Sequence, residues 1–458
     1  MVPYMLSEQR RRRNRTIVSL ETDQNLGDAL AADRYGEGYF VSNYPPFSYW
    51  TDAAATRPAS LGSTESRTRP LGIYVHIPFC RKRCHFCYFR VYTGYNAQMV
   101  EDYLGAVADE IALLIQQPAL ANRVPDFLYF GGGTPSYLSA RQFEGFMGAL
   151  QSVLDLTSLK EFTFECEPGT LSRGKLESLL AAGVGRLSLG VEHFDSTILD
   201  GNGRAHNEDD IYEAYQMARA VGFQQINIDL IAGLAGDTDS SWDDAVRRTL
   251  ELQPESVTIY QLELPYNTTF HRESRESGRD LGEFPDWPTK RRWTDRAFER
   301  MESAGYYLAS GYTAARGAAT FVYRDALWEG ADLMGVGVSA FSKIGDTHYQ
   351  NDKHIDGYTT RVRAGVLPIM RSYEMTADEA LIREVILQLK RGRLDRAAFR
   401  RNHGVDIGER FEEPLQRLCH HGWAQMDDTT IQLSRTALLQ VDRVLPWFFR
   451  PEHIQGEQ

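Results

Sequence analysis

Between residues 71 and 304 the sequence alternates six times between a short apolar run and a segment with helical spacing. The apolar runs are rich in β-branched and aromatic residues, as strands are, and they read GIYVHI (72–77), FLYF (127–130), EFTF (161–164), RLSLGV (186–191), INIDLI (226–231) and SVTIY (256–260). Repeated strand–helix units require a parallel sheet with right-handed crossovers. The predicted fold class is therefore α/β. Six units over this length predict a partial (β/α)6 barrel, with a flat doubly wound sheet as the alternative.

Polar and cysteine residues follow these strands one after another. In a barrel of this kind the loops after the strands gather at one face and carry the active site. The residues that follow the six strands in turn are the cysteine-containing run 80–87, Gly131–Pro135, Glu165, Glu192, Asp229 and Glu263. We therefore expect one functional site at the carboxyl ends of the strands.

Three of the five cysteines, Cys80, Cys84 and Cys87, lie within eight residues. Three soft thiolates in one loop suit zinc or an iron–sulfur cluster. A structural zinc site needs a fourth ligand, which His76 or His85 offers, whereas a cluster on three cysteines keeps one iron open to an external ligand. Because the loop lies at the expected catalytic face, the cluster is favoured. Zinc and simply packed thiols are the alternatives.

Other residues at this face suit a polar cofactor. The backbone at Gly131–Pro135 must approach something closely or adopt positive φ. Glu165 and Asp229 suit acceptance of hydrogen bonds from ribose hydroxyls, and Arg204 suits pairing with a carboxylate. Phe86, between two cysteines, suits packing on a flat ring such as adenine. A salt bridge, a helix cap or simple shielding is the structural alternative at each position.

The pattern along the whole sequence predicts four segments. Residues 1–70 show little periodicity and are interpreted as an N-terminal extension whose arginine run is solvated. Residues 71–310 form the predicted barrel, and the glycine-rich residues 311–375 form a segment that connects and covers it. Residues 376–458, helices followed by a β-hairpin, predict a winged-helix-like α+β module. Acidic and basic residues are mixed there, so packing or protein interaction is favoured over DNA binding.

Composition excludes several classes of protein. Lys plus Arg is 50 and Asp plus Glu is 62, a net charge of −12, which argues against broad electrostatic binding of nucleic acid. No run of 18 or more apolar residues occurs, and the N-terminal arginines precede no apolar segment, so neither a membrane span nor a secretory signal is expected. Five cysteines are too few for a disulfide framework. We expect a cytoplasmic protein without nucleic-acid or membrane partners.

Taken together, these motifs resemble the radical S-adenosylmethionine superfamily. The resemblance covers the chain from about residue 71 to its end and is most similar to the subgroup that contains oxygen-independent coproporphyrinogen III oxidase and its haem-chaperone relatives. The motifs that carry it are YVHIPFC (74–80), GGGTP (131–135), ECEPGTL (165–171), RLSLGVEHF (186–194), NIDLIAGLAGDT (227–238) and DLMGVGVSAFS (332–342).

The resemblance implies a 4Fe–4S cluster and two molecules of S-adenosylmethionine. Cys80, Cys84 and Cys87 match the cluster ligands. The positions that match those around the first S-adenosylmethionine are Tyr74, Phe86, Gly132, Glu165 and Arg204. The positions that match those around the second are Gly133, Thr134, Glu192, Asp229, Ile231 and Leu262. Glu192 and Leu262 depart from the glutamine and alanine of the oxidase.

The run CHFCYFRVYTG (84–94) also departs from the oxidase, which continues with Gly-Cys after the last cysteine. This run looks most like the class C radical methyltransferases and cyclopropanases of natural-product biosynthesis. The resemblance then implies that a deoxyadenosyl radical takes hydrogen from the methyl of the second cofactor, whose carbon adds to an sp2 carbon of an unsaturated or aromatic small molecule. Candidate bases are Glu192, Glu263, Tyr323 and His348.

The resemblance also suggests protein partners and two alternative functions. A flavodoxin- or ferredoxin-type protein is expected to donate the electron, and a separate methyltransferase-like enzyme is a further expected partner. The alternative functions are porphyrinogen decarboxylation of the oxidase type and haem transfer by a chaperone. The chaperones carry His-Asn before their Tyr-Trp element, where this chain has Tyr323-Arg324 before Leu327-Trp328.

Overall fold

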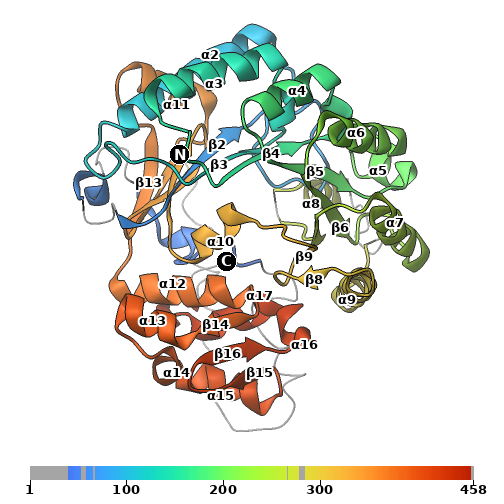
Figure 1. Ribbon diagram of the computed structural model, residues 1–458, viewed down its shortest axis with the longest axis vertical. Coiled ribbons are helices and arrows are strands. Elements are labelled where there is room, and N and C mark those ends of the chain that lie inside the picture. The colour runs from blue at the N-terminus through green and yellow to red at the C-terminus, as the bar shows by residue number, and fades with distance from the viewer. Residues whose placement is uncertain (1–39, 53–57, 65–67, 266, 278–283, 455–458) are drawn as a thin grey trace, which may run out of the picture. The chain divides into compact units, whose positions relative to one another are not determined.

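The computed structural model describes residues 40–52, 58–64, 68–265, 267–277 and 284–454. Its centre is an arc of six parallel strands in sequence order (Figure 1). These are β2 (Leu71–Ile77), β3 (Phe127–Gly132), β4 (Glu161–Cys166), β5 (Arg186–Glu192), β6 (Gln225–Ala232) and β7 (Ser256–Gln261). The α/β class and the partial barrel predicted from the strand–helix repeat are confirmed.

Helices connect these strands and cover the outer side of the arc, as Figure 1 shows for α2, α3, α4 and α6. Their bounds are α2 (Ala97–Leu114), α3 (Ala140–Val153), α4 (Arg173–Ala181), α5 (Ser196–Gly201), α6 (Glu208–Val221), α7 (Asp239–Leu252), α8 (Thr269–Ser277) and α9 (Trp287–Ser303). Local sequence sets where they begin: the side chains of Asn96 and Ser139 accept hydrogen bonds from backbone amides of the first turns of α2 and α3.

The sheet extends past both ends of the arc, in the order β1-β13-β12-β11-β10-β2 on one side and β7-β9-β8 on the other. Only β10 joins in parallel; the other added strands pair antiparallel. Segment 311–375 thus contains ordered elements: β9 (Thr313–Ala315), α10 (Val322–Trp328), β10 (Asp332–Val336), β11 (Phe341–Ile344), β12 (Thr347–Asn351), α11 (Ile355–Arg363) and β13 (Ile369–Glu374). The remaining two are β1 (Thr51–Asp52) and β8 (Tyr307–Leu308).

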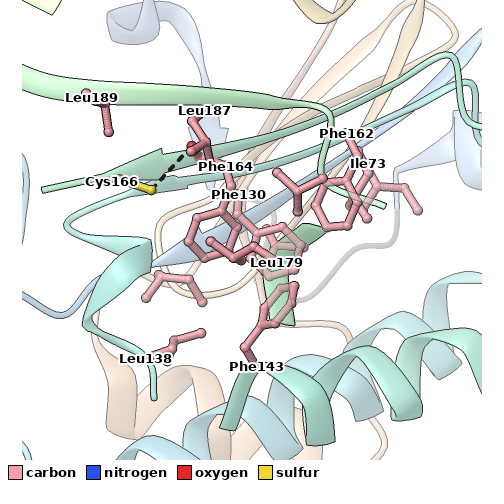
Figure 2. Close-up of a cluster of buried hydrophobic side chains, with 14 of the residues drawn as sticks. Ile73, Phe130, Leu138, Phe143, Phe162, Phe164, Cys166, Leu179, Leu187 and Leu189 are labelled. Atoms are coloured by element: carbon pink, nitrogen blue, oxygen red, sulfur yellow. Dashed lines mark hydrogen bonds between the residues drawn. The ribbon is translucent and has the colours of Figure 1, made fainter. Parts of the chain in front are cut away.

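Aromatic side chains fill the space between the arc and its helices. Figure 2 shows Phe143 of α3 directed toward the rings of Phe130 and Phe164 on β3 and β4. The Phe130 and Phe164 ring centroids lie 5.2 Å apart, and Phe143 meets Phe164 edge-on at 5.4 Å. All three are buried, and Cys166 lies in the same cluster as a buried thiol. This packing fixes the outer faces of the strands whose ends carry the predicted site.

The C-terminal segment has a second apolar core. It contains α12 (Ala377–Leu389), β14 (Arg393–Asp395), α13 (Arg396–His403), α14 (Ile407–Arg410), α15 (Glu412–His420), β15 (Ala424–Met426), β16 (Thr430–Leu433), α16 (Arg435–Leu438), α17 (Val441–Val444) and α18 (Pro451–Ile454). The predicted hairpin is the antiparallel pair β15–β16, which β14 extends to three strands. A winged-helix-like arrangement of helices and a small sheet is consistent with this topology.

Part of the predicted N-terminal extension belongs to that second core. Val41 and Tyr44 are buried in it, and the Lys390 ammonium donates to the Val41 carbonyl at 2.6 Å. The arginine run of the extension lies outside the described residues. The four-part division at residues 70, 310 and 375 stays a prediction.

No described helix is long and apolar enough to span a membrane.

A buried carboxyl group ties α2 to the loop after β10. Glu110 is 1% exposed and accepts hydrogen bonds from the Gly337 amide at 2.8 Å, the Asn351 amide group at 2.6 Å and the Tyr358 hydroxyl at 2.6 Å. Burial raises its pKa from 4.5 to about 7, although these hydrogen bonds lower it. The folded chain therefore holds a proton that the unfolded chain releases at lower pH.

Because of the Glu110 carboxyl group, we expect the folded state to become less stable as pH rises. The pKa of Glu110 is higher in the folded than in the unfolded chain, so its protonated form stabilises the folded state fully below about pH 4.5. This stabilisation is lost as pH rises from there to about 7, and the total loss is about 3 kcal/mol at most. Thermal unfolding followed from about pH 5 to about pH 8 should show a smaller decline for Glu110→Gln than for the natural chain. Glu101→Gln, exposed on the same helix, is the control, and equal declines in all three proteins would contradict the assignment.

Candidate functional site

The cysteine loop leaves β2 and is held at its base by strand-like contacts. The Cys80 amide donates to the Tyr92 carbonyl at 3.0 Å, and the Tyr92 amide donates to the Pro78 carbonyl at 2.8 Å. A turn brings the Cys87 amide to 3.2 Å from the Cys84 carbonyl. The Thr134 hydroxyl, on the loop after β3, donates to the Cys80 sulfur at 3.4 Å. The loops after the first two barrel strands therefore meet at the cysteines.

The three thiols fit an iron–sulfur cluster. Burial raises the pKa of Cys80 to about 12 and that of Cys87 to about 11, and charge on neighbouring cysteines raises both further. Thiolates this close need a cationic group among them, and iron supplies that charge. No three Cys, His, Asp or Glu side chains in the described ranges are grouped to hold a single ion. A cluster does not need such a group, because each thiolate binds a different iron.

The three glycines at the end of β3 are required because neighbouring side chains and backbone approach them closely. A Cβ at Gly131 would lie 2.9 Å from the rings of Tyr74 and Tyr129, and one at Gly133 would lie 3.0 Å from the Cys80 sulfur. Gly132 has φ +118, and a Cβ there would lie 2.6 Å from the His76 ring. Because neighbouring protein atoms already lie where a Cβ would be, only glycine lets this backbone pack closely against the cysteine loop.

Glu165 points from β4 toward the same glycines. Its carboxylate accepts from the Tyr129 hydroxyl at 2.6 Å and from the Gly132 amide at 3.1 Å. Burial raises its pKa to about 7, and nearby Asp229 adds to the rise. Tyr74 lies beside it, with its ring centroid 5.9 Å from that of Tyr129. The structure thus brings together Tyr74, Gly132 and Glu165, which sequence reasoning placed at one cofactor.

Arg204 joins the cysteine loop to the end of β5. Its guanidinium donates to the Gly190 carbonyl at 2.6 Å and to the Cys84 sulfur at 3.3 Å, and lies 3.7 Å from the Glu192 carboxylate. Glu192 has φ +67, a conformation that costs energy for a residue with a side chain. Burial raises the pKa of Glu192 to about 7, although Arg204 lowers it. The strained turn aims this carboxyl group at Arg204.

Asp229 and three apolar residues are further positions predicted to contact a cofactor. The carboxylate of Asp229, on β6, accepts from the Ser188 hydroxyl at 2.8 Å and the Asn227 amide group at 2.9 Å, and burial raises its pKa. A separate apolar cluster includes Ile231 and Leu262, with Phe86 packed against it. Which of these residues contact a first or a second cofactor molecule stays a prediction.

Sequence reasoning missed two tyrosines near the predicted site, Tyr88 next to Cys87 and Tyr260 on β7. Both are 45% exposed. Burial by surrounding protein raises the pKa of Tyr88 to about 12 and that of Tyr260 well above 10. Tyr260 lies two residues after Thr258, whose side chain contacts Asn227 inside the arc. The period of two along β7 therefore held the signal for Tyr260.

The four candidate bases do not share one place. Glu192 lies at the end of β5 beside Arg204, whereas Glu263 follows β7, where burial raises its pKa to about 8. Tyr323 stacks on Tyr129 at 4.3 Å inside the arc, and burial raises its pKa, so its hydroxyl keeps its proton.

His348 is not in the site, contrary to expectation. It lies on β12, where its ring stacks on Trp50 at 5.1 Å. Burial, with Arg383 and Lys343 nearby, holds its pKa well below 6.5. The sequence expectation failed here because the strand that carries His348 extends the sheet away from the arc.

Comparison with known proteins agrees with this geometry. A family model for the radical SAM superfamily matches residues 74–249. The oxygen-independent coproporphyrinogen III oxidase of Salmonella typhimurium is 30% identical over 397 residues, 83% of this chain and 85% of that protein. The heme chaperone HemW of Bacillus subtilis is 28% identical over 380 residues, 82% of this chain and 98% of that protein. The chain belongs to the radical SAM superfamily.

Within the superfamily the chain belongs with these oxidases and chaperones. The solved structure of coproporphyrinogen III oxidase (HemN) from Escherichia coli superimposes with a TM-score of 0.78 at 27% identity, covering 90% of this chain and 96% of the other. A radical SAM enzyme of this type uses a 4Fe–4S cluster and S-adenosylmethionine, and the cysteine loop and the glycines at the end of β3 fit both.

The expected reaction class needs correction. The class C similarity of the run at 84–94 predicted methyl or methylene transfer, or cyclopropanation, in natural-product biosynthesis. The proteins that match over most of the chain are instead named oxidase and heme chaperone. A short run after the last cysteine was outweighed by similarity over the whole barrel and the C-terminal segment. The methyltransferase-like partner was expected only as part of that reaction.

We expect the cysteines to differ sharply in their effect on the cluster. Cys84→Ala removes one thiolate ligand, so the reconstituted protein should lose its iron–sulfur absorbance and its bound iron. Cys419→Ala, a partly buried thiol on α15, should keep both. Iron and sulfide analysis with visible spectra measures the difference, and equal losses from the two substitutions would refute the ligand assignment.

Arg204 should matter for binding S-adenosylmethionine. Removing a charged, buried hydrogen-bond donor costs about 1.5–3 kcal/mol, or roughly 10- to 150-fold in affinity. Isothermal titration of reconstituted Arg204→Ala should show that loss. Arg219→Ala removes an arginine that pairs with Glu255 at 2.7 Å and should bind normally. An unchanged affinity of Arg204→Ala would remove Arg204 from the cofactor site.

Proposed function

We propose that this chain is a radical enzyme of the oxygen-independent coproporphyrinogen III oxidase type. In this reaction a propionate side chain of a porphyrinogen gives up a hydrogen atom, then loses CO2 and passes one electron to an acceptor, leaving a vinyl group. The observation that supports it most strongly is the likeness to HemN, which spans both the arc and the C-terminal segment at a TM-score of 0.78. A flavodoxin- or ferredoxin-type donor supplies the starting electron in this proposal.

The chain's own residues position the cofactor. When bound, the cluster and S-adenosylmethionine supply a carbon radical that removes a hydrogen atom from a substrate. Arg204 offers donors to the carboxylate of S-adenosylmethionine, while Glu165, ionised above about pH 7, accepts from its ammonium or ribose groups. Phe86 and the apolar cluster of Ile231 and Leu262 keep water from the reacting atoms.

Buried carboxyl groups with raised pKa values near the strand ends are compatible with a carboxylate substrate. Burial raises the pKa of Glu263 to about 8, so it is mostly protonated at neutral pH. A neutral carboxyl group donates a hydrogen bond to a propionate instead of repelling it. Tyr88 and Tyr260, whose hydroxyls also keep their protons, add donors and flat surfaces beside it. These residues are our candidates for substrate contact.

Haem binding is the second candidate function. The match to HemW covers 98% of that protein. Against it, the position where chaperone relatives carry His-Asn holds Tyr323-Arg324. Tyr323 is packed on Tyr129, and the Arg324 guanidinium lies 5.5 Å from the Phe321 ring centroid. Neither side chain offers an imidazole to haem iron, so the oxidase reaction is preferred.

Labelled substrate separates the two functions. Anaerobic protein with reductant, S-adenosylmethionine and coproporphyrinogen III deuterated on the propionate side chains should form deuterated deoxyadenosine and release CO2. Labelling the methyl of S-adenosylmethionine instead should leave deoxyadenosine unlabelled. Stoichiometric haem binding without CO2 release would favour the chaperone function. Deuterium arriving from the methyl group would contradict the decarboxylation.

A further inference from the structure

The arc of strands has a gap that its loops close. Among the described strands, β2 pairs with β10 and β3, and β7 pairs with β6 and β9, so the two ends of the arc do not pair with each other. The cysteine loop follows β2, and a short segment from Asn267 to Phe270 follows β7. These two segments nevertheless touch, which brings the first and last loops of the barrel together over the predicted cluster site.

The contacts between them are specific hydrogen bonds. One Arg83 nitrogen donates to the Cys87 carbonyl at 3.1 Å and to the Asn267 carbonyl at 3.2 Å. The Asn267 side chain donates to the Tyr88 carbonyl at 2.6 Å. The Phe270 amide donates to the His85 carbonyl at 3.2 Å, and the two rings meet edge-on at 5.3 Å. We call these contacts of Arg83, His85, Asn267 and Phe270 the clasp.

The cysteine loop has few other means of keeping its shape. From residue 83 to 90 it contains neither helix nor strand, so its backbone entropy must be offset by contacts with other segments. Besides the clasp, the His85 amide donates to the Asn202 carbonyl at 3.0 Å, and Arg204 holds the Cys84 sulfur. The loop therefore lies between two supports, one after β5 and one after β7.

Exposure distinguishes the clasp from ordinary core packing. Asn267 is exposed and belongs to none of the apolar clusters of the described chain. Arg83, within the cysteine loop, donates to the Cys87 and Asn267 carbonyls, and Asn267 donates to the Tyr88 carbonyl from outside the loop. These bonds therefore act on the position of the backbone at Cys87 and Tyr88. Loss of either side chain should loosen this loop while the core stays intact.

We propose that Asn267 and Arg83 are positioning residues that hold the cysteine loop closed and slow the loss of iron from the cluster. Opening of the clasp exposes the backbone at Cys87 and lets water and chelators reach the cluster. This role follows from the cysteine loop alone and does not depend on which substrate the enzyme uses. It also links β7, which carries Tyr260, to the loop that holds the cluster.

The test compares Asn267→Ala, Arg83→Ala and the double variant with the natural chain. Reconstituted proteins are mixed anaerobically with an iron chelator, and the decay of the cluster absorbance is followed. Removal of one neutral hydrogen bond changes an opening equilibrium by roughly 2- to 13-fold, so we expect about 5-fold faster iron loss from Asn267→Ala. Asn402→Ala, an exposed asparagine on α13, is the matched control and should lose iron at the natural rate.

A second measurement excludes a general loss of stability. In the protein without cluster, hydrogen–deuterium exchange of Asn267→Ala should quicken in peptides covering residues 83–90 and stay unchanged in those covering β3 and β4. Its thermal midpoint should match that of Asn402→Ala. Iron loss at the natural rate from both single variants would overturn the proposal, and so would faster exchange spread over the whole barrel.

Discussion

Parallel pairing of β2 to β7 is the constraint on which the rest of the structure depends. Parallel neighbours require a crossover, so each strand is followed by a helix and all six end at the same edge. Each strand then serves two purposes, because alternate residues face opposite sides. On β5, Leu187 and Leu189 pack in the outer core while Ser188 bonds Asp229 inside the arc. Packing on one side therefore holds the polar groups on the other in place.

Burial of charge governs the chemistry of that interior. Burial raises the pKa of Glu165, Glu192 and Asp229, and the charge of Asp229 also raises the pKa of the two glutamates. Protein donors, not bulk water, interact with each of these carboxyl groups. Arg204 is the cation that reaches both the carboxyl group at the end of β5 and the thiolate of Cys84. A cofactor with an ammonium, a carboxylate and a ribose finds complementary partners among these groups.

The sequence predicted the arc because its order depends on local pattern. Strand–helix alternation determined the order of β2 to β7, and residues near the strand ends were expected to meet at one edge, where Glu165 and Arg204 lie. Tyr260 was missed although the period of two along β7 held its signal, because the run 256–260 was interpreted only as an apolar strand. His348 was misplaced for a different reason, since nothing local reveals that β12 extends the sheet away from the arc. The function expected from the run at 84–94 failed because a short segment carries less information than the whole chain.

An incomplete barrel has consequences that a closed one does not. In a closed eight-stranded barrel, strand pairing joins every neighbour and layers of side chains fill the interior. Here the six parallel strands do not close into a ring, and Tyr260 on the last of them stays 45% exposed. The same incompleteness removes strand pairing between β2 and β7. The loops above must then supply what pairing would have supplied, and the bonds of Arg83 and Asn267 do so. An open arc thus provides room for cofactor and substrate, and it makes the geometry of the cysteine loop depend on a few exposed hydrogen bonds.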